Sequence, residues 1–267
     1  QPQRIEIRLP GSLVVPPREY HDFARLVASK YGIAGPPIVR GYGSSAVLPV
    51  AQGCLGNCSY CITRLARGRL LSYPEEEILA EFERMVASGT KEVLLTAQDT
   101  ACYGFDRGTD LPSLLEKMLE VEGDYRIRIG MMNPNHLVRI RKGMMDAMGD
   151  ERIYRFLHVP VQSGSDEILR SMRRGYTSGD FMSLVGYLRS ECPDISIATD
   201  VITGYPGETD ADHEATKRLV RELAADTLNI TRFSPRPGTD AMKLEPVHGR
   251  IAKERSTELT ALKNQVE

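Results

Sequence analysis

The sequence predicts an α/β protein in which six parallel β-strands alternate with helices in a partial (βα)6 barrel. The first observation behind this prediction is repetition: from residue 46 onward, a short β-rich run, a loop and an amphipathic segment recur six times. Repeated βα units of this kind form parallel sheets with right-handed crossovers. The second observation is that a polar motif follows the strands, and such folds bind their ligands at the carboxyl ends of the strands.

The predicted strands are short runs of β-branched and large apolar residues between turn signals. They are Ala46–Val50, Glu92–Thr96, Arg126–Met131, Phe156–Val159, Ile195–Ile202 and Leu228–Phe233. The predicted helices lie between these strands and carry apolar residues at helical spacing. They are Pro74–Ala87, Leu111–Leu119, Leu137–Met148, Ser165–Met172, Ser178–Ser190, Ala211–Ala224 and a last helix from Gly249 to the end.

The segment before the first strand carries no motif. Pro and Gly residues predict loops there, and Glu19 to Tyr31 predicts a short amphipathic helix. We therefore divide the chain into an irregular or helical N-terminal extension (1–43), the (βα)6 core (44–245) and a C-terminal helix that leads out of the core (246–267).

The composition is that of an ordinary soluble globular protein, with 267 residues, 41% of them hydrophobic and 26% charged. No apolar run has the length of a membrane span and no signal-peptide pattern is present, so we expect a cytoplasmic protein without membrane contact. Five cysteines, three of them clustered, argue for a reducing compartment and against disulfides. The net charge of −2 gives no global attraction to nucleic acid. We take a monomer as the default.

Cys54, Cys58 and Cys61 form a Cys-x-x-x-Cys-x-x-Cys loop directly after the first strand. A closed structural zinc site takes four protein ligands, and iron–sulfur clusters are ordinarily held by four cysteines. Three thiolates therefore leave one coordination position open, which is typical of a metal that does chemistry. Zinc with a distant fourth ligand is the alternative, although Cys102 and Cys192 belong to no Cys-x-x-Cys pair.

Polar residues at later strand ends suit either a ligand or a local structural role. Gln98 and Asp99 follow the second strand, Ser163 follows the fourth, and Asp200 lies within the fifth. Capping of a loop by Asp99 or of a helix by Ser163 would explain those two without a ligand. A buried Asp200 needs a polar partner, and Arg174 can pair with a carboxylate in bidentate fashion.

Arginines gather at two of these strand ends. One group follows the cysteine loop and the other lies at the end of the sixth strand; together they are Arg64, Arg67, Arg69, Arg232 and Arg236. Such a rim would bind an RNA phosphate backbone with salt-dependent affinity. A solvated loop is the alternative interpretation of Arg64, Arg67 and Arg69.

The cysteine spacing, with Tyr60 directly before the third cysteine, resembles that of the radical S-adenosylmethionine (SAM) enzymes. The resemblance implies a barrel of the radical SAM type and a [4Fe-4S] cluster on Cys54, Cys58 and Cys61, whose open iron binds SAM. It also implies a low-potential electron donor and the reductive cleavage of SAM to a 5′-deoxyadenosyl radical.

By their positions after the strands, we assign to the SAM pocket Tyr60, Gln98, Asp99, Ser163, Arg174, Asp200 and Phe233. Gln98 or Asp99 would receive the amino group of SAM, and Arg174 would pair with its carboxylate. Ser163 would bind the ribose. Phe233 would lie against the adenine, and plain core packing is the alternative for this residue.

Four motifs resemble those of the methylthiotransferase branch of these enzymes. They are Gly-Cys-Leu-Gly-Asn-Cys-Ser-Tyr-Cys, His-Val-Pro-Val-Gln-Ser-Gly-Ser-Asp, Thr-Asp-Val-Ile-Thr-Gly-Tyr-Pro-Gly-Glu-Thr and Phe-Ser-Pro-Arg-Pro-Gly-Thr. The version here is most similar to the archaeal and eukaryotic type, which attaches a methylthio group to threonylcarbamoyladenosine in tRNA. The resemblance implies tRNA as the partner of the full-length protein. A short relative with another substrate, or a non-catalytic metal- or RNA-binding module, is the alternative.

Members of that family carry a second cluster on three further cysteines near the N-terminus, and a C-terminal β-domain that grips tRNA. No cysteine precedes Cys54 in this chain. We therefore expect the chain by itself to hold one cluster and to cleave SAM without methylthiolating tRNA.

Overall fold

A computed structural model describes residues 42–266. The chain divides into two units, Gln1–Gly41 and Tyr42–Glu267. The helix predicted from Glu19 to Tyr31 lies outside the described residues. The predicted division at residues 43 and 245 stays a prediction.

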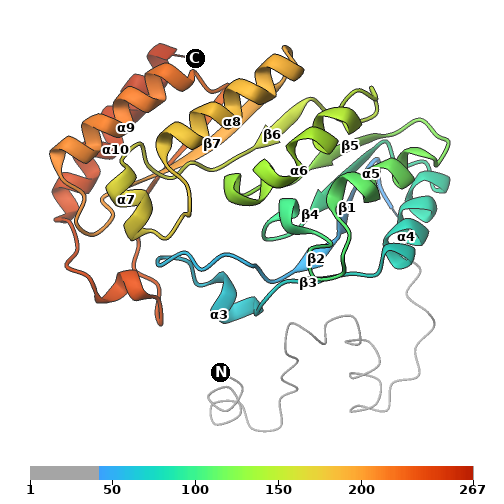
Figure 1. Cartoon of the computed structure of the whole chain (residues 1–267), viewed down its shortest axis with the longest axis horizontal. Coiled ribbons are helices and arrows are strands. Elements are labelled where there is room, and N and C mark those ends of the chain that lie inside the picture. The colour runs from blue at the N-terminus through green and yellow to red at the C-terminus, as the bar shows by residue number, and fades with distance from the viewer. Residues whose placement is uncertain (1–41, 267) are drawn as a thin grey trace, which may run out of the picture. The chain divides into compact units, whose positions relative to one another are not determined.

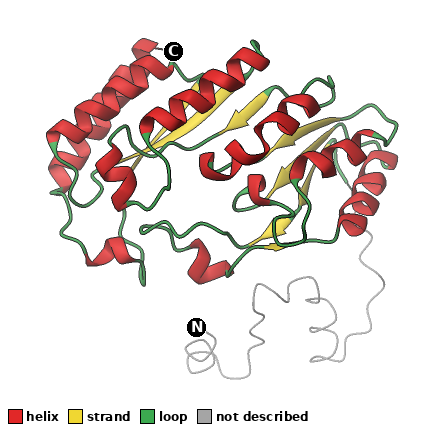
Figure 2. Cartoon of the chain, viewed as in Figure 1, coloured by secondary structure: helices red, strands yellow, loops and turns green. Residues whose placement is uncertain are grey.

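Six parallel strands form the centre of the described unit (Figures 1 and 2). They are β1 (Ser45–Pro49), β4 (Glu92–Thr96), β5 (Arg126–Ile129), β6 (Phe156–His158), β7 (Ser196–Thr203) and β8 (Thr227–Arg232). They pair as two parallel three-stranded sheets, β1-β4-β5 and β6-β7-β8. An isolated parallel bridge pairs Ile127 of β5 with Ile153, in the segment that leads into β6. Within residues 42–266 no pairing closes β8 onto β1, so the predicted partial (βα)6 barrel is confirmed.

Helices cover the outer face of these strands (Figure 2). They are α4 (Glu75–Ala87), α5 (Leu111–Leu119), α6 (Pro134–Ala147), α7 (Asp166–Ser171), α8 (Ser178–Glu191), α9 (Asp210–Leu223) and α10 (Gly249–Val266). None of the helices in the described part is long and apolar enough to cross a bilayer.

Buried and exposed side chains alternate along the strands, and this alternation separates the packed outer face of the strands from the barrel interior. On β5, Ile127 and Ile129 are buried in the main core, whereas Arg128 between them is exposed on the opposite face. On β1, Ala46 and Leu48 are buried and Val47 between them is 57% exposed. Because successive side chains of a strand point to opposite faces, the exposed residues line the inner, open side of the partial barrel.

Helix boundaries follow the local capping chemistry. The structure begins α6 at Pro134, three residues before the predicted Leu137, because the side chain of Asn133 accepts a hydrogen bond from the Asn135 N–H and proline suits the first helical position. At the start of α9, Thr209 and Asp212 form a capping box in which each side chain accepts from the other's backbone N–H.

The sequence did not predict the small elements around the cysteine loop. These are the antiparallel pair β2 (Ala51–Gln52) and β3 (Leu71–Ser72), the short helix α3 (Thr63–Arg67) and the turns η2 (Thr100–Cys102) and η3 (Asp240–Lys243). Two-residue strands are too short to show a periodicity. Their pairing depends on backbone contacts across the loop that they enclose.

The last helix packs onto the same body. Leu259 and Leu262 of α10 are buried in the main core. The Arg255 guanidinium pairs with Glu208 at 2.8 Å and with Asp210 at 2.7 Å. The helix thereby ties the end of the chain to the turn that follows β7.

Candidate functional site

The cysteine loop projects from the carboxyl end of β1 and is closed at its base by backbone contacts. The Cys54 N–H donates to the Gly68 carbonyl at 3.3 Å, and the Gly53 N–H donates to Gln98 Oε1 at 2.6 Å. Gly53 has φ +75°, and a Cβ there would lie 2.1 Å from the Arg69 carbonyl oxygen. Only glycine therefore allows the two ends of the loop to approach this closely.

Each of the three sulfurs receives one N–H donor. The Gly56 N–H reaches Cys54 Sγ at 3.2 Å and the Thr63 N–H reaches Cys61 Sγ at 3.4 Å. The third donor is a side chain, Arg174, whose Nη1 lies 3.3 Å from Cys58 Sγ. The loop therefore supplies each sulfur with a polar partner from the protein itself.

Burial favours the protonated form of Cys54. It raises the pKa of this thiol to about 11, although the Gly56 N–H lowers it in part. The thiol therefore holds its proton until a metal displaces it, as expected for a coordinating cysteine.

The spacing of the sulfurs distinguishes between a single ion and a cluster. Among residues 42–266, one set of three candidate ligand atoms lies within 4.8 Å of one another, Asp99, Cys102 and His136, and the three loop cysteines are not such a set. Thiolates on one zinc stand about 3.8 Å apart, because the Zn–S bond is about 2.3 Å. A Cβ on Gly56 would lie 3.3 Å from Cys54 Sγ and 3.7 Å from Cys58 Sγ, so glycine keeps the space between them free. This wider cradle fits a multi-iron cluster better than one zinc ion.

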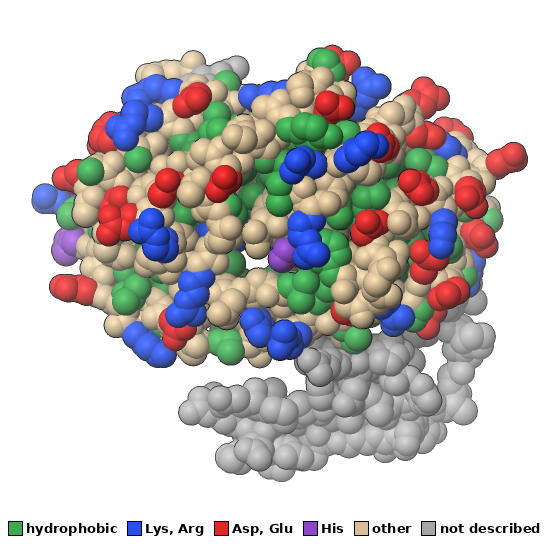
Figure 3. Space-filling model, viewed as in Figure 1, with side chains coloured by type: hydrophobic (Ala, Val, Ile, Leu, Met, Phe, Trp, Pro, Cys, Tyr) green, Lys and Arg blue, Asp and Glu red, His purple; other side chains and the backbone are tan. Residues whose placement is uncertain are grey.

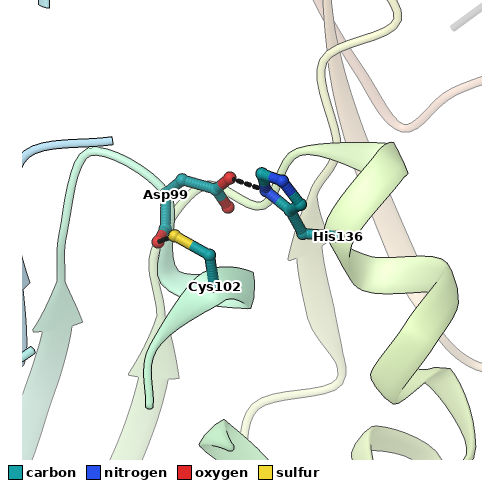
Figure 4. Close-up of side chains that lie close together, drawn as sticks. All are labelled: Asp99, Cys102 and His136. Atoms are coloured by element: carbon teal, nitrogen blue, oxygen red, sulfur yellow. Dashed lines mark hydrogen bonds and ion pairs between the residues drawn. The ribbon is translucent and has the colours of Figure 1, made fainter. Parts of the chain in front are cut away.

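The set of Asp99, Cys102 and His136 is a hydrogen-bonded hub beside this cradle (Figure 4). The Asp99 carboxylate contacts His136 Nδ1 at 2.5 Å and accepts from the N–H groups of Asn133 and Ala101. The Cys102 thiol donates to the Asp99 carbonyl oxygen at 3.1 Å, and burial raises its pKa. With its thiol protonated and its carboxylate bonded three times within the protein, the hub joins the loop after β4 to the start of α6.

Gln98 and Asp99 therefore occupy different environments. Asp99 is 1% exposed and bonded within the hub. Gln98 is half-buried and lies against the base of the cysteine loop, where it accepts from Gly53.

Ser59 binds the tip of the cysteine loop to the half of the barrel that contains β6, β7 and β8. No sequence pattern indicates this residue. Its hydroxyl lies 2.8 Å from both the Ser171 carbonyl and the Tyr205 hydroxyl. Its N–H donates to the Met172 carbonyl at 3.1 Å. The metal loop thus begins on β1 and is anchored at the end of α7.

Two predicted pocket residues, Tyr60 and Phe233, gather around this anchor. Tyr60, Ile202 and Phe233 pack against a small core that includes Tyr205. The rings of Tyr205 and Phe233 meet edge to face at 5.4 Å. The structure thereby gathers aromatic residues far apart in the sequence around Tyr205, which itself contacts Ser59 of the cysteine loop.

Asp200 faces the barrel interior and has the polar partners that a half-buried acid requires. Its Oδ1 lies 2.8 Å from His158 Nε2 and accepts from Asn229 Nδ2 at 2.8 Å. Burial tends to raise the pKa of this carboxyl, but the bonds from His158 and Asn229 outweigh it and lower the pKa. His158 and Asn229 were not singled out, because only the strand register brings them to Asp200.

Ser163 lies elsewhere, between α7 and α9. Its side chain is completely buried, contacts the Thr216 hydroxyl at 3.3 Å and accepts from the Ser165 N–H at 3.1 Å. In this structure the Ser163 hydroxyl holds the turn before α7 against α9.

The two segments that carry the five predicted rim arginines meet at one direct contact. Gly238 lies against Leu65 of α3, since a Cβ on it would be 3.2 Å from Leu65 Cδ1. Figure 3 shows Lys and Arg side chains along this edge, over α3 and the segment after β8. In the described part of the chain none of the following forms an ion pair: Arg64, Arg67, Arg69, Arg232 and Arg236.

Comparison with known proteins identifies one matching family and a set of similar sequences. The family described as the radical SAM superfamily matches residues 48–220. A probable threonylcarbamoyladenosine tRNA methylthiotransferase of Pyrococcus horikoshii is 46% identical over 220 residues, which cover 82% of this chain and 52% of that protein. A threonylcarbamoyladenosine tRNA methylthiotransferase of Homo sapiens is 43% identical, over 80% of this chain and 37% of that protein. The chain thus spans about half the length or less of these relatives.

Solved structures show the same fold at low sequence identity. A radical S-adenosylmethionine methyltransferase from Kitasatospora setae, solved with cobalamin and a [4Fe-4S] cluster, superimposes with a TM-score of 0.60 at 19% identity, over 74% of this chain and 38% of that one. The radical SAM enzyme coproporphyrinogen III oxidase from Escherichia coli gives a TM-score of 0.60 at 17% identity, over 83% of this chain and 52% of that one.

Proposed function

The chain belongs to the radical SAM superfamily, and on this premise we propose that it binds a [4Fe-4S] cluster through Cys54, Cys58 and Cys61 and cleaves SAM reductively. The observation that carries the proposal is the loop itself: three sulfurs, each with one N–H donor, around a space that a glycine keeps free. A three-thiolate set on a four-iron cluster leaves one iron open for a further ligand. When bound, the cluster would supply the electron that splits the sulfonium of SAM.

The protein's own residues bind and orient SAM in this proposal. Gln98 is a better candidate than Asp99 for the amino group, because Asp99 is buried and already bonded within the hub. Tyr60 and Phe233 offer aromatic faces to the adenine next to the cysteines. For Ser163 the packing role has the support of its contacts with Thr216 and Ser165. Asp200 and His158 face the interior as a hydrogen-bonding pair.

For the substrate, we propose that the full-length protein acts on tRNA and methylthiolates threonylcarbamoyladenosine, as the names of the similar proteins indicate. The rim of unpaired arginines beside the cysteine loop supports this choice, since phosphate contacts supply most of the affinity for nucleic acid. The 267-residue chain alone should not complete the reaction. Neither remaining cysteine is placed to hold a second cluster, because Cys102 is buried in the hub and Cys192 is buried at the end of α8.

Anaerobic reconstitution with iron and sulfide tests the proposal. We expect about four irons per chain, the content of a single cubane cluster, and formation of 5′-deoxyadenosine from SAM when dithionite is added. Replacement of Cys58 by Ala should abolish both. With tRNA present, mass spectrometry should detect 5′-deoxyadenosine and no methylthio-nucleoside.

A colourless protein that holds one zinc would end the proposal in favour of a structural metal module. An iron content of about eight, or the methylthiolated nucleoside formed by this chain alone, would contradict the single-cluster part only.

A further inference from the structure

We propose that Arg174 acts on the cluster ligand Cys58, as a positioning residue that raises the reduction potential of the cluster, and that it does not bind the SAM carboxylate. The inference rests on the proposed [4Fe-4S] site. It replaces the role that the sequence suggested for this arginine.

The hydrogen bonds of Arg174 leave no edge of its guanidinium for a carboxylate. Nε donates to the Tyr176 hydroxyl at 2.8 Å and Nη2 to the Pro160 carbonyl at 3.0 Å. Nη1 directs its two N–H groups to Cys58 Sγ at 3.3 Å and to the Tyr60 hydroxyl at 3.4 Å. A bidentate carboxylate needs two parallel free N–H groups on one edge. Four of the five N–H groups are in use, so neither edge provides such a pair.

The surroundings hold the side chain in this position. Arg174 is 7% exposed and stands at the end of a tight turn after α7, in which its N–H donates to the Leu169 carbonyl at 3.0 Å. The Tyr176 hydroxyl, which accepts from Nε, is itself fixed by contacts of 3.1 Å and 3.0 Å to the carbonyl oxygens of Pro160 and Val161. Reorientation of the guanidinium towards a ligand would break its bonds to Tyr176, Pro160 and Cys58 in a buried site, where unpaired donors are costly.

The position of the charge determines its effect. Backbone N–H groups serve Cys54 and Cys61, so Arg174 is the one side chain, and the one full positive charge, that donates to a loop sulfur in the described part of the chain. Hydrogen bonds to the sulfurs, net charge and burial are the principal levers on the potential of a cluster. A buried cation beside a thiolate stabilises the reduced cluster, which carries one more negative charge, and therefore raises its potential.

The test is a redox titration of the reconstituted cluster, followed by electron paramagnetic resonance, in the wild type and in Arg174→Gln and Arg174→Lys. We expect Arg174→Gln to make reduction at least tenfold less favourable, a fall of about 59 mV for a one-electron couple. Arg174→Lys should recover most of this fall because it keeps the charge. The matched control is Arg173→Gln, at a neighbouring exposed arginine that pairs with Asp240 at 2.9 Å. The reduction potential of the cluster in this variant should equal that in the wild type.

SAM binding to the oxidised cluster, measured in the same proteins, separates the two roles of Arg174. The dissociation constant should change less than about threefold in Arg174→Gln, whereas loss of a charge-assisted carboxylate pair would raise it about tenfold or more. An unchanged potential together with weakened SAM binding would overturn the proposal.

If neither Arg174 variant retains a cluster, Tyr176→Phe decides the question. This change removes the oxygen that positions Nε and leaves the charge in place. A smaller fall of the potential in the same direction supports the proposal, and no fall refutes it. A wild-type chain that forms no cluster would instead count against the proposed function.

Discussion

Single side chains determine the geometry of the site where the strand register brings distant residues together. Asp200 is an example: it is joined to His158 of β6 and Asn229 of β8, residues that lie 42 and 29 positions away in the chain. The sequence predicted that an acid within a strand needs partners, because a buried unpaired carboxylate is costly. It did not identify the partners, since those depend on which strands are neighbours and on the register of their pairing.

The depressed pKa of Asp200 predicts how stability depends on pH. The carboxyl has a lower pKa folded than unfolded, so its contribution is present above the unfolded value of about 3.9 and is lost as the pH falls through the folded value. We expect Asp200→Asn to lower the free energy of unfolding of the metal-free protein by about 1–2 kcal/mol at pH 7. The difference from the wild type should shrink below about pH 4.

Urea titrations at pH 7 and pH 3 measure the free energies of unfolding of Asp200→Asn and of the wild type. Asp146→Asn, which removes one exposed partner of Lys142, is the control and should shift the free energy by no more than about 0.5 kcal/mol at pH 7. A difference for Asp200→Asn that is the same at both pH values would show that the bonds to His158 and Asn229 do not stabilise the ionised form.

At the scale of elements, the sequence predicted the main strands and helices well and the small elements around the metal loop poorly. All six strands overlap their predicted ranges, and β4 and α5 match them at both ends, because burial on one face imposes a clear period on the residues. The pair β2 and β3 has two residues on each strand, and it forms because Gly53 lets the backbones of the loop ends approach. A contact of this kind is visible in the sequence only as a glycine, because it imposes no periodic pattern on the residues.

The closure at Gly53 gives a prediction about metal loading. Gly53→Ala would place a methyl group 2.1 Å from the Arg69 carbonyl oxygen, in a backbone conformation with φ +75° that already disfavours alanine. The base of the loop must then open, and we expect the iron content after reconstitution to fall to less than half that of the wild type.

Gly89→Ala is the matched control for this substitution. Gly89 has a similar φ of +89°, but nothing lies within 4 Å of its added Cβ. This variant should lose about 1–2 kcal/mol of stability and keep its full iron content. If both variants load iron equally well, closure of the loop base does not govern metal binding.

At the scale of the molecule, charge is distributed unevenly although the net charge is only −2. In the described part of the chain, the rim arginines on or just after α3 and at or after the end of β8 form no ion pair, whereas many charges elsewhere are paired, such as Lys91 with Asp124 at the amino end of β4. A balanced total charge therefore conceals a local basic edge beside the metal loop.

This edge predicts the salt dependence of RNA binding. We expect the double variant Arg67→Gln/Arg69→Gln to bind tRNA more weakly, and the slope of log affinity against log salt concentration to fall by about 1 to 2, since each lost phosphate contact removes close to one counterion. Fluorescence anisotropy at several salt concentrations measures the slope. The double variant Lys91→Gln/Arg126→Gln, with the same change of charge at the amino ends of β4 and β5, should leave the slope unchanged. Equal slopes in both double variants would remove the rim from the RNA interface.

The sparse backbone connection between the two sheets also affects how the protein opens. Strands β1, β4 and β5 lie within residues 45–129 and strands β6, β7 and β8 within residues 156–232, so each sheet is a continuous stretch of chain (Figure 1). Few backbone bonds connect them, among them Ile127 N–H to Arg152 O at 2.7 Å and Met132 N–H to His158 O at 2.8 Å. The two sheets share one hydrophobic core, but this sparse backbone pairing leads us to expect that they open as separate cooperative units in hydrogen exchange.

The cysteine loop crosses this boundary, because it begins on β1 and is bound at its tip by Ser171, Met172 and Tyr205. Amides of the two sheets in the metal-free protein should therefore exchange with two different opening free energies. The bond from Arg174 to Cys58 Sγ links the two halves as well. A cluster that fixed Cys58 together with Cys54 and Cys61 would stiffen this link, and the two values should converge in exchange measured by mass spectrometry. A metal that holds this loop would then make one cooperative body of two half-barrels.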